Sequence, residues 1–332
     1  MKIMVTGADG FLGNNIVREL LKRNARVTAL IHPESNYYTL QDLNIERYFG
    51  DVLRFEDVYY LSKKADVIIH AAACNSVWPS KNKLVRDVNI TGTKNIINAC
   101  KLNHIKRLIY VSSASVFSPG TLESPAAETA SFTKFNYGLD YIDSKLVAHK
   151  MVLEAAKSGV PAILVNPTYM IGPYDSKPGS GKLLVSLIEG KVPVMPEGGK
   201  NFVSVKDVAT AICNSITLGK AGESYILGNQ NLSYKEFFVI AARLFNLPLP
   251  VFRLPKGIML LMGYLNGLIS GIIRTQPVIS KNIVQASFVN QYYTSQKAVK
   301  ELKMPQSSIE SAIMEAVSWF QENNYLIRKI VA

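Results

Sequence analysis

Residues 6–13 of the chain read TGADGFLG, and this stretch decides the fold. It follows a short apolar run, Lys2–Thr6, and it opens a segment with helical spacing of apolar side chains, Phe11–Arg23. Glycines at such a strand-to-helix turn are typical of a dinucleotide-binding loop, because the free N–H groups and the positive end of the helix attract phosphate. We expect Gly7 to permit the tight turn, Gly10 to admit the pyrophosphate and Gly13 to let the helix pack closely on the strand.

Short apolar runs alternate with helical segments through the first half of the chain. This alternation predicts an α/β fold with a parallel, doubly wound sheet of the Rossmann type. The predicted strands are Lys2–Thr6, Arg26–Ile31, Glu46–Phe49, Asp66–His70, Leu108–Val111 and Val160–Val165. The predicted helices between them include Phe11–Arg23 and Lys81–Leu102.

The pattern loosens after Asn166, where five prolines between residues 167 and 196 interrupt it. A helix at Val205–Leu218 and a strand at Glu223–Leu227 then return the chain to the sheet once, and the remainder is mostly helical up to Ile309–Asn323. We therefore predict a dinucleotide-binding domain of residues 1–165 plus 201–228. The predicted substrate-binding lobe is smaller, mostly helical, and made of residues 166–200 plus 229–332.

Length and composition limit the class of protein. The chain has 332 residues, which suits about two domains of ~150 residues each. Hydrophobic residues make up 48% and charged residues 19%, which excludes a disordered or low-complexity chain. The net charge of +12 fits a phosphorylated ligand, an anionic membrane or nucleic acid. Because no run of five lysines and arginines occurs, we do not expect a nucleic acid partner.

The cysteines and histidines indicate a reduced protein without a metal. Three cysteines occur with no C-x-x-C pair, so buried thiols in a reducing cytoplasm are expected rather than a disulfide framework. The four histidines lack the spacing of metal ligands. The start of the chain does not read as a signal peptide, because its apolar run is short and a glycine loop follows.

One uncharged stretch, GIMLLMGYLNGLISGII at residues 257–273, raises the question of a membrane. It is shorter than the about 20 residues that a span needs. Gly263, Gly267 and Gly271 lie four residues apart on one helical face, which resembles a helix-packing surface. We expect a helix packed on the substrate lobe, with weak contact to a membrane surface as the alternative.

The spacing Tyr-x-x-x-Lys puts both side chains on one helical face, and five pairs in this chain have it. Context selects Tyr141 and Lys145, because they follow a predicted strand that ends in Ser112 and Ser113. Ligands bind at the carboxyl ends of parallel strands. We expect Ser113, Tyr141 and Lys145 to be catalytic, and Asn89 to support Lys145 through water.

These residue types suit carbonyl reduction, which needs a proton donor at the oxygen while hydride arrives at the carbon. A free tyrosine has a pKa of about 10 and is a poor base at neutral pH. We expect Lys145 and an oxidised nicotinamide to lower the pKa of Tyr141. Tyr141 then acts as the acid in reduction or as the base in oxidation, and Ser113 holds the substrate oxygen.

Taken together, these residues resemble the extended short-chain dehydrogenase/reductase family, in its dihydroflavonol reductase-like and hopanoid-associated epimerase-like branch. The motifs that carry the resemblance are the glycine loop, Asp51-Val52, His70-Ala71-Ala72-Ala73, Asn89, Ser112-Ser113, Tyr141-x-x-x-Lys145, Asn166-Pro167, Gly172-Pro173 and Phe202-Val203-x-Val205-x-Asp207-Val208. The resemblance implies that Asp51 and Val52 meet the adenine and that Ala71–Ala73 lie beside the cofactor. It also implies that Pro167–Tyr169 lie near the nicotinamide amide, and that the protein is a homodimer.

The complete set of expected cofactor contacts joins the loop, the strand ends and the catalytic helix. It consists of Gly7, Asp9, Gly10, Phe11, Leu12, Gly13, His32, Asp51, Val52, Ala71, Ala72, Ala73, Asn89, Ser112, Tyr141, Lys145, Pro167, Thr168 and Tyr169. Enzymes that use NAD usually carry an acid at the end of the second strand for the ribose hydroxyls. Ile31 and His32 stand there instead, so we favour NADP(H), with NAD(H) as the alternative.

Three functions remain open at this stage. The first is an NADPH-dependent reductase of a ketone or aldehyde, or the reverse oxidation. The second is a nucleotide-sugar epimerase or dehydratase that retains NAD, and the third is a non-catalytic protein that senses a dinucleotide. Four aromatic residues that follow cofactor-side segments, Trp78, Phe117, Tyr137 and Tyr169, suggest an apolar wall for a lipophilic or aromatic substrate, and residues 178–182 form a substrate-side loop.

Overall fold

The computed structural model describes residues 1–133, 138–192, 194–195, 197–249, 255–273 and 281–328. Within these residues, seven parallel strands form a large sheet in the order β3-β2-β1-β4-β5-β6-β9. The bounds are β1 Lys2–Thr6, β2 Arg26–Ile31, β3 Glu46–Phe49, β4 Val67–His70, β5 Arg107–Val111, β6 Ala162–Pro167 and β9 Ser224–Leu227. The strand order reverses between β1 and β4, which is where a Rossmann sheet binds its ligand. The predicted fold class and the single return of the chain to the sheet are confirmed.

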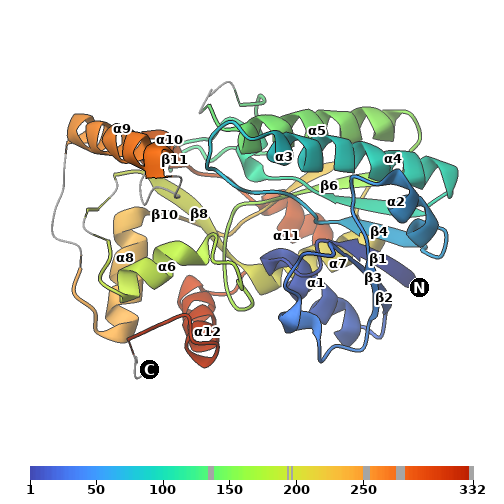
Figure 1. Cartoon of the computed structure of the whole chain (residues 1–332), viewed down its shortest axis with the longest axis horizontal. Coiled ribbons are helices and arrows are strands. Elements are labelled where there is room, and N and C mark those ends of the chain that lie inside the picture. Colours follow the sequence, from blue (N-terminus) through green and yellow to red (C-terminus); the bar gives the residue numbers. More distant parts are fainter. Residues whose placement is uncertain (134–137, 193, 196, 250–254, 274–280, 329–332) are drawn as a thin grey trace.

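Helices cover both faces of this sheet (Figure 1). One core joins the sheet to α1 Phe11–Lys22, α7 Val205–Leu218 and α11 Gln296–Leu302. The other core joins it to α2 Phe55–Ser62, α4 Thr93–Leu102 and α5 Asp140–Lys157. Along β1, Ile3 and Val5 face the first core and Met4 faces the second, as the two-residue period of a strand requires. Burial on both faces explains why inner strands such as β1, β4 and β5 are continuous apolar runs in the sequence.

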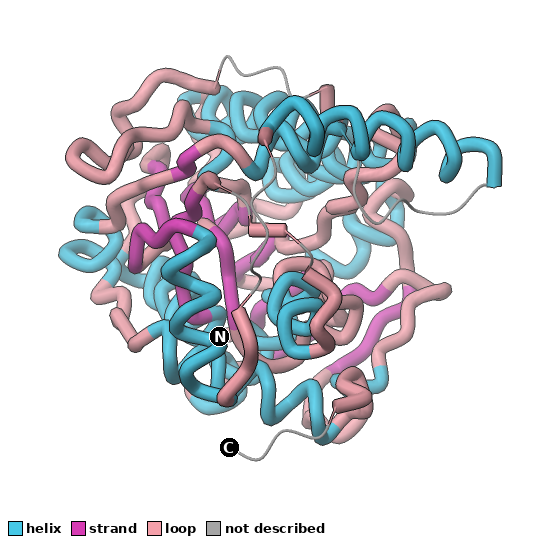
Figure 2. Tube along the Cα trace, turned by 90° about the vertical axis from the view of Figure 1, so that its left-hand side faces the viewer, coloured by secondary structure: helices cyan, strands magenta, loops and turns pink. Residues whose placement is uncertain are grey.

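A second, smaller sheet holds the substrate-side elements together. It consists of β7 Tyr169–Ile171, β8 Gly199–Ser204, β10 Gln230–Ser233 and β11 Asn290–Gln291. Around Phe202 and Phe237, whose rings stack with centroids 4.3 Å apart, it packs against α6 Gly181–Ile188, α8 Tyr234–Phe245 and α12 Ile309–Glu322. Figure 2 shows the strands inside the molecule, with helices around them. The division into two domains by residue range remains a prediction. Strand β8, most of which falls in the predicted dinucleotide-binding domain, lies in the small sheet, and α11, from the predicted substrate-binding lobe, packs against the large sheet.

The predicted helix Lys81–Leu102 is not one regular helix. The chain forms α3 Lys83–Arg86, then a π-helical turn at Asp87–Gly92, and then α4. The hydroxyl of Thr93 donates a hydrogen bond to the Asn89 carbonyl at 2.7 Å, and such a bond competes with the regular backbone pattern. The turn matters for the site, because it carries Asn89.

The uncharged stretch forms α9 Lys256–Ile273, which lies at the upper left edge of the molecule in Figure 1, beside α10 Lys281–Ser287. Its Met259 and Gly263 are buried, and Gly267 faces the ring of Trp78. The helix therefore packs on the substrate side, as the sequence predicts. Among the described residues, none of the helices combines the length and the apolar character that crossing a bilayer requires.

Candidate active site

The glycine loop joins β1 to α1 with a geometry that only glycines allow. Gly7 has a φ of +68°, and a Cβ there would lie 2.6 Å from the backbone of Ala72. A Cβ on Gly13 would lie 1.9 Å from the carbonyl oxygen of Gly7. Gly10 meets only that same oxygen, at 3.3 Å, so its other side stays open. As the sequence predicts, Gly7 makes the tight turn, Gly13 lets the helix pack closely on the loop, and Gly10 leaves the approach to the loop open.

The first turn of α1 is suited to bind phosphate. Gly10 is its N-cap residue and supplies no capping side chain, and the first turn contains no acidic residue. The N–H groups at this end are therefore not capped by a side chain, and the helix dipole adds a partial positive charge. These features fit the pyrophosphate of a dinucleotide.

A cavity of about 260 Å³ lies between the glycine loop, the carboxyl ends of β4, β5 and β6, and the loop at residues 175–180. Most of the predicted site residues line it together. They are Gly7, Gly10, Phe11, Leu12, Gly13, Ala71, Ala73, Ser112, Ser113, Tyr141, Lys145, Pro167, Thr168 and Tyr169. The other six predicted residues, Asp9, His32, Asp51, Val52, Ala72 and Asn89, lie outside this lining.

Tyr141 and Lys145 project from the first two turns of α5 into this cavity. The Lys145 ammonium donates a hydrogen bond of 2.7 Å to the carbonyl oxygen of Val111, the last residue of β5. Ser113 follows that strand, and its hydroxyl lies 2.8 Å from the hydroxyl of Ser115. The end of β5 therefore fixes both the lysine and the serine relative to the tyrosine.

Burial controls the protonation of these groups. It raises the pKa of Tyr141, and a hydrogen bond with Ser113 acts in the opposite direction. It lowers the pKa of Lys145 to about 7. Tyr141 therefore holds its proton at neutral pH, because desolvation dominates at the phenol and the Lys145 ammonium hydrogen-bonds the strand end. The lowering of its pKa by Lys145 together with an oxidised nicotinamide stays a prediction.

The depressed pKa of Lys145 predicts a pH dependence of stability. The unfolded lysine has a pKa of 10.5 and the folded one about 7, so the unfolded state binds more protons between these values. Stability of the cofactor-free protein therefore rises with pH, by about 2 kcal/mol from pH 7 to pH 9 through this group. Urea unfolding of the wild type and of Lys145→Met at both pH values measures the effect. A difference between the two proteins that is independent of pH would contradict it.

Asn89 acts on the framework of the site. Its side chain accepts from the Cys74 amide at 2.9 Å, donates to the Cys74 carbonyl at 3.0 Å and donates to the Ser144 hydroxyl at 2.9 Å. These bonds tie the chain after β4 to α5, next to Lys145. The direct connection of Asn89 is thus to Ser144, one residue before the lysine.

The predicted adenosine end lies where β2 and β3 finish. His32 Nε2 is 3.8 Å from Asp51 Oδ2, and both side chains are partly exposed. Val52 is nearly buried and lies against Gly92. The Asp9 carboxylate pairs with the Lys177 ammonium, at 3.6 Å.

The loop 175–181 contributes residues that the sequence analysis did not assign. The buried Asp175 carboxylate accepts from the amides of Gly179 and Gly181, and burial raises its pKa. Tyr169 donates from its hydroxyl to the Ser180 carbonyl. Six further residues line the cavity, namely Asn75, Val111, Met170, Asp175, Gly179 and Ser180. The available signal was the glycine-rich stretch 178–182, of which Gly179 and Ser180 line the cavity, and its contact with the substrate stays a prediction.

The expected aromatic wall is only partly present. Tyr169 lines the cavity, and Trp78 packs near Gly267 of α9. Phe117 is instead buried, because its ring stacks on Phe132 and meets His149. Tyr137 lies outside the described residues.

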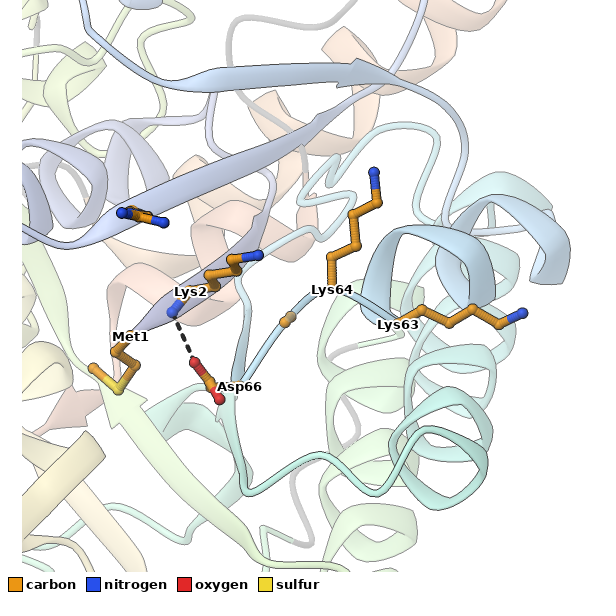
Figure 3. A pocket seen from close by; sticks show the side chains of 7 residues that line it. Met1, Lys2, Lys63, Lys64 and Asp66 are labelled. Atoms are coloured by element: carbon orange, nitrogen blue, oxygen red, sulfur yellow. Dashed lines mark hydrogen bonds between the residues drawn. The ribbon is translucent and has the colours of Figure 1, made fainter.

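A second hollow, of about 550 Å³, lies at the amino ends of β1 and β2 (Figure 3). Its lysines, Lys2, Lys63 and Lys64, do not converge on a common point, and Asp66 accepts from the Lys2 amide at 2.9 Å. Ligands of parallel sheets bind at the carboxyl ends of the strands. The cavity at the glycine loop is therefore the candidate active site.

Comparisons with known proteins agree with this geometry. Residues 3–228 match the NAD dependent epimerase/dehydratase family. A Synechocystis protein named after dihydroflavonol 4-reductase is 31% identical, over 97% of this chain and 95% of its own length. The sterol demethylase protein B of Methylococcus capsulatus is 26% identical, over 98% of this chain and 100% of its own. The crystal structure of gox2253 superposes with a TM-score of 0.85 at 27% identity, covering 98% of this chain and 99% of that one.

Proposed function

This chain belongs to the NAD-dependent epimerase/dehydratase family, and on that premise we propose that it is an NADP(H)-dependent reductase of ketones or aldehydes, which also catalyses the reverse oxidation. One observation carries the proposal. Ser113, Tyr141 and Lys145 line the same cavity as the glycine loop. A proton donor and a dinucleotide site thus share one space, which hydride transfer to a carbonyl requires.

The bound nicotinamide supplies the hydride, and the residues of the chain handle the proton and the orientation. Tyr141 keeps its proton at neutral pH and donates it from its hydroxyl to the substrate oxygen. Ser113 donates a second hydrogen bond to that oxygen and so orients the carbonyl. Lys145, one helical turn from Tyr141, favours the phenolate that forms when the lysine is protonated, because opposite charges attract.

We propose a lipophilic or aromatic substrate. The cavity is lined on its apolar side by Phe11, Leu12, Val111 and Met170. The names of the two relatives given above refer to a dihydroflavonol and to a sterol, and both of these are molecules with several carbon rings. A panel of aryl and alicyclic ketones tests this proposal, with turnover measured as the loss of NADPH absorbance. Turnover confined to sugar nucleotides would overturn it.

The cofactor preference predicts the effect of a single substitution. At His32, an NADP 2′-phosphate meets an imidazole, whereas an aspartate would repel that phosphate and accept bonds from ribose hydroxyls. We expect His32→Asp to weaken NADPH binding at least 10-fold and to leave NADH binding unchanged or stronger. Glu34→Gln, beyond Pro33, is the control. Titrations of both cofactors with each variant measure the preference, and an unaltered ratio in His32→Asp contradicts the proposal.

The alternative is an epimerase or dehydratase that retains NAD, which the name of the matching family supports. Sugar-nucleotide enzymes of the resembled family carry an arginine for the diphosphate where Lys200 stands here. Lys200 donates to the Gln291 side chain in the small sheet, and burial lowers its pKa to about 8. Mass spectrometry of cofactor released on denaturation separates the two functions, since retained NAD would favour the alternative.

A further inference from the structure

Helix α9 exposes an apolar face that none of the described residues covers. Between residues 257 and 273 it carries no charged residue. Ile258, Leu261, Met262 and Leu265 are each 44% to 58% exposed. Their spacing of i, i+3, i+4 and i+7 makes one continuous stripe along the helix. We call these four residues the α9 stripe.

The opposite face of α9 attaches the helix to the body of the protein. Met259 lies in a small apolar cluster with Val194 and Val284, and Gly267 approaches the Trp78 ring. The attachment therefore uses other side chains than the α9 stripe. A large exposed apolar patch on one element is typical of a surface that binds something else.

Charge indicates what binds there. From Glu236 to Glu301 the intervening sequence contains no aspartate or glutamate, and it contains seven lysines and arginines. Two of these basic residues precede the uncharged stretch, Arg253 and Lys256, and two follow it, Arg274 and Lys281. An apolar stripe with only basic residues around it in the sequence complements an anionic bilayer, whose interior takes the apolar side chains and whose phosphates attract the cations.

We propose that the α9 stripe docks this protein on the surface of an anionic lipid bilayer. A second copy of the chain is the less suitable occupant, because two such regions would bring like charges together. The helix lies on the membrane rather than crossing it, since its other face is attached to the protein.

The docking face adjoins the substrate side of the active site. Helix α10 contacts α9. Ala286 near the end of α10, and Val289 just after it, pack in one cluster with Val77 and Tyr141. A lipophilic substrate dissolved in the bilayer would then reach the cavity without passing through water. This consequence rests on the proposed function, whereas the docking itself does not.

Vesicle flotation of the full-length protein, without substrate or cofactor, tests the docking. The vesicles are pure phosphatidylcholine, or phosphatidylcholine with phosphatidylglycerol at 3:1, in about 0.1 M salt. We expect at least 10-fold tighter binding to the anionic vesicles. The double variant Leu261→Asp/Met262→Asp should lose that binding at least 10-fold, because two apolar contacts are replaced by repelled charges.

A matched control uses the same substitutions at equally exposed positions elsewhere. Leu84 and Met314 are 55% and 47% exposed on α3 and α12, so Leu84→Asp/Met314→Asp should bind vesicles as the wild type does. Melting temperatures confirm that both variants fold.

Equal binding by the two double variants, or no binding by the wild type, overturns the proposal. Sedimentation without lipid tests the other occupant. If the wild type self-associates and only Leu261→Asp/Met262→Asp abolishes this, the α9 stripe binds a second copy of the chain instead. Tyr141→Phe should bind vesicles normally, which separates this test from that of the reductase.

Discussion

Replacing Tyr141 with phenylalanine is expected to lower kcat for carbonyl reduction by about 10³-fold, while the Kd for the preferred cofactor changes less than about twofold. General acid catalysis contributes typically 10²- to 10⁴-fold, and Tyr141 supplies the phenol that lines the cavity with Ser113. Phenylalanine keeps the ring that packs with Ile142 and Val77 and removes only the hydroxyl. Steady-state NADPH oxidation and a cofactor titration measure the two quantities separately.

The chain provides a matched control for this substitution. Tyr59, on α2, has the same Tyr-x-x-x-Lys spacing. The Lys63 ammonium lies 4.5 Å from the centroid of the Tyr59 ring. Tyr59→Phe should leave kcat unchanged, because that pair lies away from the carboxyl edge of the sheet. Unchanged turnover in Tyr141→Phe would refute the catalytic assignment. A wild type that binds cofactor and reduces nothing would favour the non-catalytic alternative.

The sequence was sufficient for the large sheet because that part of the fold is encoded locally. The inner strands, such as β1 and β4, are short apolar runs buried on both faces, whereas the edge strand β3 is largely exposed. The turn after β1 must be made of glycines. The strand β6 nevertheless begins two residues later than predicted, at Ala162, and extends to Pro167. Its register is set by pairing, with Leu108 opposite Ala162 and Leu227 opposite Pro167, and not by its own composition.

The small sheet and the 175–181 loop could not be predicted in the same way. Strand β10 has the sequence QNLS, and its residues are only half-buried, so it has no apolar alternation to detect. Asn201 joins strands far apart in the sequence, through bonds to Thr168, Asn231 and Tyr293. Such polar contacts leave no periodic signal. The same holds for Asp175, whose role depends on two backbone amides that reach it only after the loop has closed.

Replacing Gly13 with alanine should have the second large effect, on both stability and cofactor binding. The new methyl carbon would lie 1.9 Å from the Gly7 carbonyl oxygen and 2.9 Å from Ala8 Cα, both backbone atoms. Helix α1 must therefore move away from the loop. Overpacking of this kind costs about 3 kcal/mol, and displacing one N–H group from a phosphate weakens binding about 10- to 100-fold. Urea unfolding and cofactor titration measure the two losses.

Two further glycine variants distinguish packing from cofactor contact. A Cβ on Gly257, at the start of α9, meets nothing within 4 Å, so Gly257→Ala should be neutral or slightly stabilising. A Cβ on Gly10 meets only the Gly7 oxygen, at 3.3 Å, and Gly10 lines the cavity. Gly10→Ala should therefore retain most of the stability and still lose cofactor affinity, because the methyl group occupies the approach of the pyrophosphate. If Gly10→Ala binds cofactor as the wild type does, the pyrophosphate does not lie at this turn, whatever Gly13→Ala does to the fold.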